Sequence, residues 1–277
     1  MHETNEKLRA LQQRELETLK EVIRICEEND IRYYAFYGTQ LGTMRHKGFI
    51  PWDDDVDICM TRKDYNKFLA IAPEKLSEGY RLETYANCKN DEVYTARVID
   101  VNTRVRVHTA KEPVEQSLWV DLWSMCAVPD NQLVFLYYKL AMLFTRMLVQ
   151  ISVYKKIIHQ GRKNRPFHER AIMWVCEHVD FSKVINTKKM KARYEKLADE
   201  MDARGGRRVV EIWSECKFRD LYDRDWFGEG VMMPFEDMEI RMPDKSHEIM
   251  SMYYGDYMTL PPEEDRDIQH KMEIVQV

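Results

Sequence analysis

Residues 48–60 have the sequence GFIPWDDDVDICM, in which Asp53, Asp54, Asp55 and Asp57 place four carboxylates within five positions. Carboxylates this close repel one another, and transferring them into a protein interior costs still more free energy. Apolar and aromatic residues nevertheless flank the cluster on both sides, as expected for a segment that enters a hydrophobic core. The arrangement therefore predicts a functional site, with a solvated acidic turn as the alternative.

The spacing of the aspartates fits an extended strand with two different faces. In such a strand Asp53, Asp55 and Asp57 share one face. Val56 and Ile58 then point to the opposite face and into the core. Three carboxylates on one face are stable only when positive charge lies among them. Hard oxygen ligands in this number suit Mg²⁺ or Mn²⁺, so the sequence predicts a divalent metal site here.

A glycine turn precedes the aspartates. The segment IRYYAFYG, residues 31–38, is rich in aromatic and β-branched residues and predicts a strand. A short helix follows directly after it. Glycine lets backbone N–H groups approach a phosphate, and a helix N-terminus adds partial positive charge. We therefore expect Gly38 and Thr39, with Gly42 on the same short helix, to contact a phosphorylated substrate.

A third carboxylate comes from the segment LWVDLWSM, residues 118–125, which predicts another strand. Asp121 lies between Val120 and Leu122 and so projects from an otherwise apolar strand. Its alternative role is that of a strand-end aspartate bonded to a loop. The glycine turn, the paired aspartates and this third aspartate together resemble the arrangement of the nucleotidyltransferase superfamily. In that arrangement metal ions bridge the carboxylates and the phosphates of a nucleotide.

Further segments make the resemblance more specific. Residues 37–68, YGTQLGTMRHKGFIPWDDDVDICMTRKDYNKF, are similar to the signature of the LicD family of phosphotransferases. Residues 96–103, 118–131 and 233–264 are similar to later segments of that family. The likeness extends over residues 31–266, and its helical middle part is the least distinctive.

The resemblance implies roles for four carboxylates. Asp55 and Asp57 match the paired metal-binding aspartates, and Asp53 matches the acidic residue before them. Asp121 matches the third aspartate, either as a metal ligand or as the general base that takes a proton from the acceptor hydroxyl. The expected metal ligands are therefore Asp53, Asp55, Asp57 and Asp121. The expected catalytic residues are Asp55, Asp57 and Asp121.

The family resemblance also implies an activity. Enzymes of this family transfer a phospho-alcohol from a CDP-activated alcohol to a sugar hydroxyl and release CMP. We expect the donor to be CDP-choline. The expected acceptor is a cell-surface glycan or its lipid-linked precursor, as in lipopolysaccharide or teichoic acid. CDP-ribitol and CDP-glycerol stay open as donors. The alternatives from other classes are a metal-dependent glycosyltransferase with an Asp-x-Asp motif and a binding module without catalysis.

Basic and aromatic residues near these motifs are predicted to contact the substrate. The candidates for binding phosphate are Arg45, His46, Lys47 and Arg97. Charge-assisted hydrogen bonds from arginine suit phosphate oxygens, although His46 has a surface or capping role and Arg97 a structural salt bridge as alternatives. Choline binds against aromatic faces, and core packing is the alternative for any aromatic residue. The candidates for that cage are Trp52, Trp119, Trp123, Tyr253 and Tyr254.

The 277 residues are enough for one large domain. We predict an α+β fold, with a nucleotidyltransferase-like mixed β-sheet flanked by helices and a mainly helical insertion. The predicted parts of this single domain, 1–277, are an N-terminal helix (1–30), the sheet core (31–131), the helical insertion (132–206) and the C-terminal part of the catalytic domain (207–277). Further strands are expected over 80–86, 94–101 and 103–108. Further helices are expected after the cap residue Thr61 and around 245–254.

The net charge, the cysteines and one apolar segment predict the partners and the cellular location of the protein. The net charge of -5 gives no general attraction to nucleic acid, so no nucleic-acid partner is expected. The six cysteines are scattered without a CxxC pair, which fits a reducing compartment and predicts a cytoplasmic protein. Residues 133–154 are strongly apolar but are interrupted by Lys139, Arg146 and Gln150. This pattern predicts a buried helix, with a helix resting on the inner face of the membrane as the alternative.

Overall fold

The computed structural model describes residues 2–88, 93–107, 113–155, 167–266 and 272–276. Its α-helices are α1 (His2–Glu28), α2 (Tyr37–His46), α3 (Arg62–Lys75), α4 (Gln132–Val153), α5 (Phe167–His178), α6 (Thr187–Asp202) and α7 (Ser246–Tyr254). Its strands are β1 (Tyr33–Ala35), β2 (Asp57–Thr61), β3 (Tyr80–Glu83), β4 (Ala96–Val107), β5 (Val114–Val128), β6 (Arg208–Glu211), β7 (Tyr222–Asp223), β8 (Val231–Phe235), β9 (Met238–Met242) and β10 (Met272–Gln276). Three short 3-10 helices are η1 (Phe181–Lys183), η2 (Arg224–Trp226) and η3 (Glu263–Asp265).

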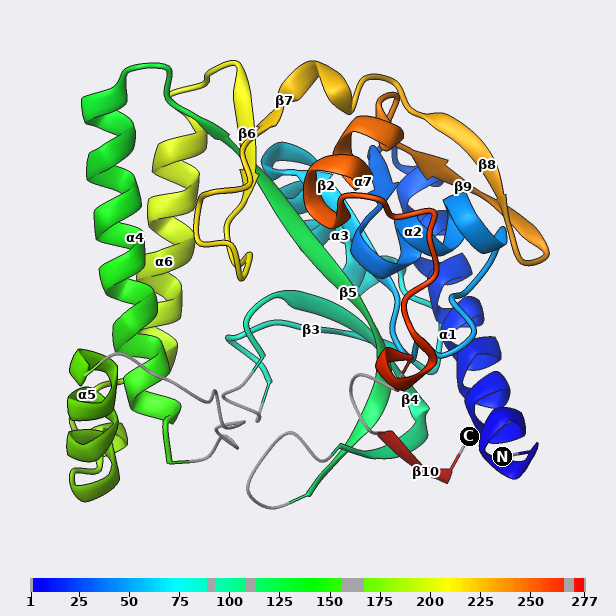
Figure 1. Cartoon of the computed structure of the whole chain (residues 1–277), viewed down its shortest axis with the longest axis horizontal. Coiled ribbons are helices and arrows are strands. Elements are labelled where there is room, and N and C mark those ends of the chain that lie inside the picture. The colour runs from blue at the N-terminus through cyan, green and yellow to red at the C-terminus, as the bar shows by residue number, and fades with distance from the viewer. Residues whose placement is uncertain (1, 89–92, 108–112, 156–166, 267–271, 277) are drawn as a thin grey trace.

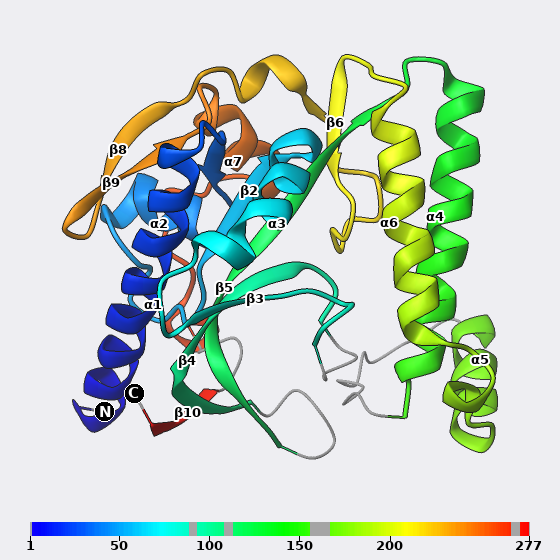
Figure 2. The ribbon, with the colours of Figure 1, turned by 180° about the vertical axis from the view of Figure 1, so that it is seen from behind.

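A curled, mixed sheet organises these elements and confirms the predicted α+β class. Its central path runs β1-β2-β5-β4-β10, with β3 on β4, β6 on β5 and β7 on β6. Strands β2 and β5 are parallel, whereas the other pairs in this sheet are antiparallel. Strand β5 crosses the molecule between α4 and α6 on one side and α1, α2 and α3 on the other (Figures 1 and 2). Strands β8 and β9 form a separate hairpin.

The core of the sheet depends on α1, whose apolar residues recur at helical spacing. The residues of α1 buried in this core are Leu16, Leu19, Val22, Ile23, Ile25 and Cys26. Alternate residues of the two parallel strands meet them, namely Ile58 and Met60 from β2 and Val120 and Leu122 from β5. Because successive strand residues point to opposite faces, the residues between them project from the other face of the sheet. That other face carries Asp57 and Asp121.

Several predicted strands differ from the observed ones in their bounds. The first strand ends at Ala35, because Tyr37 has a left-handed backbone (φ 41) and begins α2. The strands expected over 94–101 and 103–108 are a single strand, β4, which ends at Val107, and position 108 lies outside the described residues. The pairing of β4 with β5 shifts register between Asp100 and Val105, which spans the boundary between the two predicted pieces.

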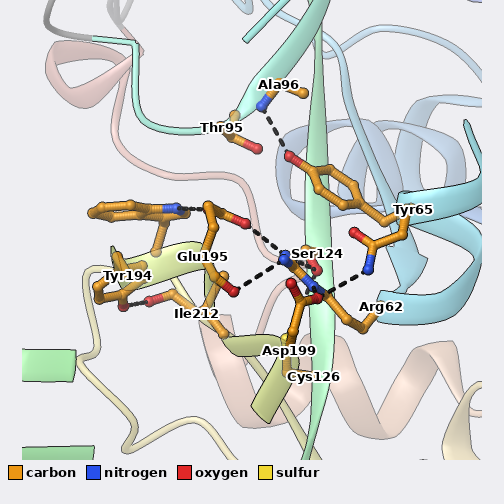
Figure 3. Close-up of polar contacts among 12 residues, drawn as sticks. Arg62, Tyr65, Thr95, Ala96, Ser124, Cys126, Tyr194, Glu195, Asp199 and Ile212 are labelled. Atoms are coloured by element: carbon orange, nitrogen blue, oxygen red, sulfur yellow. Dashed lines mark hydrogen bonds and ion pairs between the residues drawn. The ribbon is translucent and has the colours of Figure 1, made fainter. Parts of the chain in front are cut away.

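The expected cap of α3 is confirmed. The Thr61 hydroxyl accepts a hydrogen bond from the Asp64 backbone N–H at 3.2 Å, so the helix begins at the next residue, Arg62. Arg62 then joins α3 to α6, as Figure 3 shows. Its guanidinium forms ion pairs with Glu195 at 2.6 Å and with Asp199 at 2.7 Å, and only 4% of its side chain is exposed. Breaking the buried pair with Glu195 costs about 3–5 kcal/mol, so this contact holds α6 against α3.

The helical part is mainly α4 and α6, which lie side by side in both views (Figures 1 and 2). They share a hydrophobic cluster with Cys126 and Val128 of β5 and Val210 of β6. Helix α4 is the one helix of the described residues that is long and apolar enough to cross a membrane, and 33% of its most apolar 18-residue stretch is buried in the protein. Core helices of soluble proteins can have the same length and composition, so these two properties alone do not identify a membrane span.

The prediction of a buried helix holds for one side of α4 only. Phe135, Tyr138, Met142 and Val149 are buried against the rest of the protein. The other side exposes an apolar row at helical spacing, formed by Leu133, Leu136, Tyr137, Leu140, Phe144 and Met147. Most neighbouring members of this row are three or four positions apart, and Leu136 and Tyr137 are adjacent, so the row follows one side of the helix.

Candidate active site

Two of the predicted aspartates face each other across neighbouring strands. Asp57 of β2 is paired with Asp121 of β5, and Asp121 is in turn paired with Arg97 of β4. Residues that are directly opposite on neighbouring strands project to the same face of a sheet. Asp57, Asp121 and Arg97 therefore form a row on the face of the sheet opposite the core that α1 covers. Their nearest strand neighbours Ile58 and Leu122 are buried on the core side.

The backbone before Asp57 differs from the prediction. Strand β2 begins at Asp57, and residues 53–56 are irregular rather than extended in the sheet. Val56 and Ile58 are nevertheless completely buried, as the alternation predicted. The irregular segment is held by α1, because the side-chain amide of Gln12 donates to the backbone oxygen of Asp53 at 2.9 Å.

A cavity of ≈ 740 Å³ lies over this face, a size typical of small-ligand sites. The four predicted metal ligands line it, namely Asp53, Asp55, Asp57 and Asp121. The predicted substrate contacts that line it are Gly38, Arg45, Trp52 and Arg97. The predicted contacts Thr39, Gly42, His46 and Lys47 are not among the residues lining this cavity. The structure therefore brings together the carboxylates and half of the predicted substrate contacts.

The glycine turn acts differently from the prediction. The left-handed residue at the start of α2 is Tyr37, with φ 41, rather than Gly38. Gly38 matters because it lacks a side chain, since a Cβ atom there would lie 2.5 Å from Asp53 Oδ2. Thr39 is 4% exposed, and its hydroxyl accepts a hydrogen bond from the Asp57 backbone N–H at 2.8 Å. Thr39 therefore positions an aspartate of the cavity.

Gly42 allows close packing behind the cavity. A Cβ atom on Gly42 would lie 2.4 Å from the backbone oxygen of Gly48. Only glycine therefore lets α2 approach the loop that leads to the aspartates. Lys47 is exposed and ends α2 in a left-handed conformation with φ 58.

The basic residues differ in their partners. Arg97 donates to Glu83 at 2.9 and 3.1 Å and to Gln116 at 3.1 Å, which is the structural salt bridge left open as its alternative. Arg45 donates to the backbone oxygen of Tyr257 at 2.9 Å. Its Nε also donates to His46 Nε2 at 2.9 Å. Burial lowers the pKa of His46, and the Arg45 charge lowers it further.

The carboxylates of the site affect one another. The pKa of Asp57 is raised well above its usual value, mainly by burial and then by the charges of Asp55 and Asp121. The indole N–H of Trp123 opposes this rise by donating to Asp57 Oδ1 at 2.6 Å. The indole N–H of Trp119 donates to Asp121 Oδ2 at 2.8 Å. The site is therefore a region of crowded negative charge whose carboxylates are oriented by indole groups.

The donor chemistry of this region fits the predicted metal. Four carboxylates around one cavity supply the hard oxygen ligands that Mg²⁺ and Mn²⁺ prefer, and a cation would relieve the repulsion that raises the pKa of Asp57. Within the described part of the chain, however, no three His, Cys, Asp or Glu side chains are grouped closely enough to hold a metal ion. The metal ligand set therefore stays a prediction.

Sequence reasoning missed two carboxylates near the site. Glu15 of α1 is completely buried, and its pKa is raised by burial and by the charges of Asp55, Asp54 and Asp53. Glu211 ends β6 and lines the cavity with 1% of the residue exposed. The sequence could have identified Glu211 as a candidate site residue. Glu211 follows Val209 and Val210 in an apolar strand, just as Asp121 follows Val120.

The cavity joins crowded carboxylates to basic and aromatic side chains over a mixed sheet, a lining that suits a small charged ligand. A protein-family model described as LicD/FKTN/FKRP, nucleotidyltransferase domain, matches residues 30–172, which is more than half of the chain. The chain therefore belongs to the LicD family, as the aspartate motif and its flanking segments predicted.

Curated relatives support this membership. The chain is 29% identical over 254 residues to the lipopolysaccharide cholinephosphotransferase LicD of Haemophilus influenzae, which covers 90% of each protein. It is 38% identical over 65 residues to an uncharacterized protein of Rickettsia typhi, covering 24% of this chain and 21% of that protein. The first similarity extends along nearly the whole chain, whereas the second is local.

Proposed function

We propose that the protein transfers phosphocholine from CDP-choline to a hydroxyl group of a cell-surface glycan and releases CMP. The Haemophilus influenzae relative, a lipopolysaccharide cholinephosphotransferase, supports this choice because it aligns over 90% of both chains. The cavity supports it because carboxylates, arginines and aromatic rings together suit a ligand with phosphate and ammonium groups. The observation that carries the proposal is the register that places Asp57 opposite Asp121 in this cavity.

In the proposed reaction, the acceptor hydroxyl oxygen attacks the phosphorus atom that carries choline. A P–O bond to the acceptor forms, the P–O bond to CMP breaks, and the hydroxyl proton passes to Asp121. Asp121 suits this role because it is partly exposed in the cavity, whereas Asp57 is buried. The Trp119 indole, which donates to Asp121 Oδ2, fixes the orientation of the carboxylate that receives the proton.

Asp53, Asp55 and Asp57 are the proposed ligands of Mg²⁺ or Mn²⁺, with Asp121 as the alternative fourth. A bound divalent ion neutralises charge on the diphosphate of the donor and on the leaving CMP. Arg45, which lines the cavity beside Trp52, is proposed to bind a donor phosphate. Thr39 holds the Asp57 backbone in place through its hydroxyl.

The acceptor is proposed to be attached to lipid, as lipopolysaccharide is for the Haemophilus influenzae relative. The exposed apolar row of α4 then rests on the membrane surface that carries this acceptor, and the protein acts at the cytoplasmic face. A bilayer is the proposed occupant of this row because it presents the acceptor and the apolar surface together. The row lies opposite the side of α4 that packs into the protein.

The direct test is CMP release from CDP-choline with lipopolysaccharide and Mg²⁺. The Asp57→Asn variant is expected to lose at least about a hundredfold in rate, the usual effect of removing one electrostatic contact to the reacting group. Asp237→Asn serves as the matched control, because Asp237 is an exposed surface residue paired with Lys20. Full activity of the Asp57→Asn variant would remove the proposed role of the carboxylate row.

The same assay separates the alternative donors. CDP-ribitol and CDP-glycerol carry neutral alcohols, and a UDP-sugar tests the glycosyltransferase alternative. Turnover of one of these with no turnover of CDP-choline would replace choline as the transferred group. Absence of turnover with every donor, in a protein that stays folded, would favour a binding module.

A further inference from the structure

Glu211 is a buried carboxylate that the proposed chemistry does not use. It lies at the end of β6, opposite Met125 of β5, and lines the cavity. One of its oxygens accepts a hydrogen bond from the Tyr37 hydroxyl at 3.2 Å, and the other accepts from the Trp213 backbone N–H at 2.6 Å. Among the described residues, no lysine or arginine forms an ion pair with Glu211, and the charge of Arg146 acts on it only from a distance.

Burial, with a smaller contribution from the charge of Asp220, raises the pKa of Glu211 to about 8 against the opposing effects of the Trp213 N–H, of Arg146 and of Tyr37. A carboxylate that is buried without a cation is costly, because it loses hydration without gaining a partner of opposite charge. A positively charged group that enters the cavity would therefore be attracted to this position. Since the cavity is open to ligands, that cation can belong to a ligand.

Aromatic rings surround the same part of the cavity. Tyr37 lies 5.6 Å from Trp123 in an edge-on arrangement and 5.2 Å from Tyr253, measured between ring centroids. Tyr37, Trp123 and Tyr253 all line the cavity. Tyr253 also contacts Tyr254, with their ring centroids 4.7 Å apart. The rings next to Glu211 therefore hold one another in place before any ligand arrives.

Three tryptophans of the cavity already face cations of the protein. Trp52 has Arg45 at 6.0 Å and Arg266 at 5.4 Å from its ring centroid, Trp119 has Arg97 at 4.9 Å, and Trp213 has Arg146 at 5.7 Å. A second cation on these rings would be repelled by the guanidinium groups. Trp52, Trp119 and Trp213 are thus poor members of a choline cage, whereas Tyr37 donates to the Glu211 carboxylate and contacts Trp123 and Tyr253.

We propose that Tyr37, Trp123 and Tyr253 form an aromatic box for the quaternary ammonium group of choline and that Glu211 is its counter-ion. The identity of the cation rests on the proposed function. Trp123 joins the box to the phosphate end of the cavity, because its indole donates to Asp57 while its ring contacts Tyr37. A zwitterion such as phosphocholine can therefore place its phosphate near the aspartates and its ammonium beside Glu211.

The test compares phosphocholine with 3,3-dimethylbutyl phosphate, which has the same shape but carries a neutral carbon in place of the nitrogen. Binding of each to the full chain is measured by calorimetry with Mg²⁺ present. The wild-type protein is expected to prefer phosphocholine by at least about tenfold, because cation–π contacts and a buried carboxylate act on the charged form only. In Glu211→Gln this preference should fall to near one, while Glu229→Gln, a change at an exposed surface carboxylate, should retain it.

The possible results separate the box from the transfer reaction. Equal binding of the two ligands by the wild-type protein, or a preference that persists in Glu211→Gln, would overturn the box even if CDP-choline is turned over. A preference that depends on Glu211 would support the box even if CDP-choline gives no CMP. Tyr253→Leu gives a second measurement, in which affinity for phosphocholine should fall more than affinity for the neutral analogue.

Discussion

The backbone of Gly38 lies against the carboxylate of Asp53, so closely that a Cβ atom on residue 38 would be 2.5 Å from Asp53 Oδ2. Gly38→Ala should therefore displace Asp53 from the cavity without preventing folding, because the clash involves the end of a side chain. We expect CMP release to fall at least about tenfold, comparable to other changes that displace a metal ligand. Thermal unfolding should change little, since alanine also favours the helix.

The control for this variant is Gly205→Ala. Gly205 has a left-handed backbone (φ +66), with no atom within 4 Å of an added Cβ. Its replacement should cost about 1 kcal/mol of stability through backbone strain, yet leave activity unchanged. If Gly38→Ala turned over donor as fast as the wild type, the close contact with Asp53 would have no part in the reaction.

The Asp57–Asp121 pair leads to a prediction on metal binding. Adding Mg²⁺ or Mn²⁺ should raise the unfolding temperature of the wild-type protein, because a cation relieves repulsion among the buried carboxylates. At 100 times the dissociation constant the gain is about 2.7 kcal/mol. Asp57→Asn should largely abolish the gain, as measured by calorimetry before and after addition of a chelator. A shift of equal size in Asp57→Asn would place the metal elsewhere.

The parts of the site that sequence reasoning predicted are those encoded by local pattern. Alternation in Val56–Ile58 and the apolar neighbours of Asp121 were enough to place two carboxylates on strands with buried opposite faces. Their pairing in one row depends on the parallel register of β2 with β5, which no local pattern specifies. The resemblance to the LicD family is what predicted that Asp57 and Asp121 belong to one site.

The parts that were missed come from long-range contacts. Tyr37 and Glu211 are 174 positions apart in the sequence, and they meet only because β6 returns to the edge of β5. Arg97 lines the cavity, as expected of a phosphate contact, but the strand pairing of β3 with β4 also sets Glu83 directly beside it, and no local pattern gave that partner. Sequence periodicity gives the face of a strand but not the partner on the next strand.

The exposed row on α4 predicts membrane binding that depends on apolar side chains. Leu140→Glu should leave the fold intact, because Leu140 is 57% exposed. The fraction of protein that sediments with vesicles of phosphatidylethanolamine and phosphatidylglycerol should fall at least about tenfold. The reason is that a charged group replaces an apolar side chain that the membrane would bury. Val184→Glu is the control, as Val184 is 82% exposed but lies outside the row.

Two results would contradict the membrane role of α4. The first is wild-type protein that stays in the supernatant at every vesicle concentration. The second is a dimer in solution that Leu140→Glu dissociates, measured by light scattering. That result would assign the row to contact between copies of the chain.

Replacing Glu211 with glutamine should raise the stability of the folded protein by an amount that depends on pH. Its pKa is about 8 in the folded protein and near 4.5 in the unfolded chain, so the unfolded chain binds fewer protons between these values. The stability that Glu211 contributes is therefore present below pH 4.5 and is lost as the pH rises to 8.

In Glu211→Gln the amide oxygen can still accept hydrogen bonds from Tyr37 and Trp213, but no charge is buried. The variant should thus unfold at a higher temperature than the wild type at pH 8, with a difference of at most about 5 kcal/mol that disappears towards pH 4.5. A variant that is less stable than the wild type at pH 8 would show that Glu211 is held there as a favourable charge.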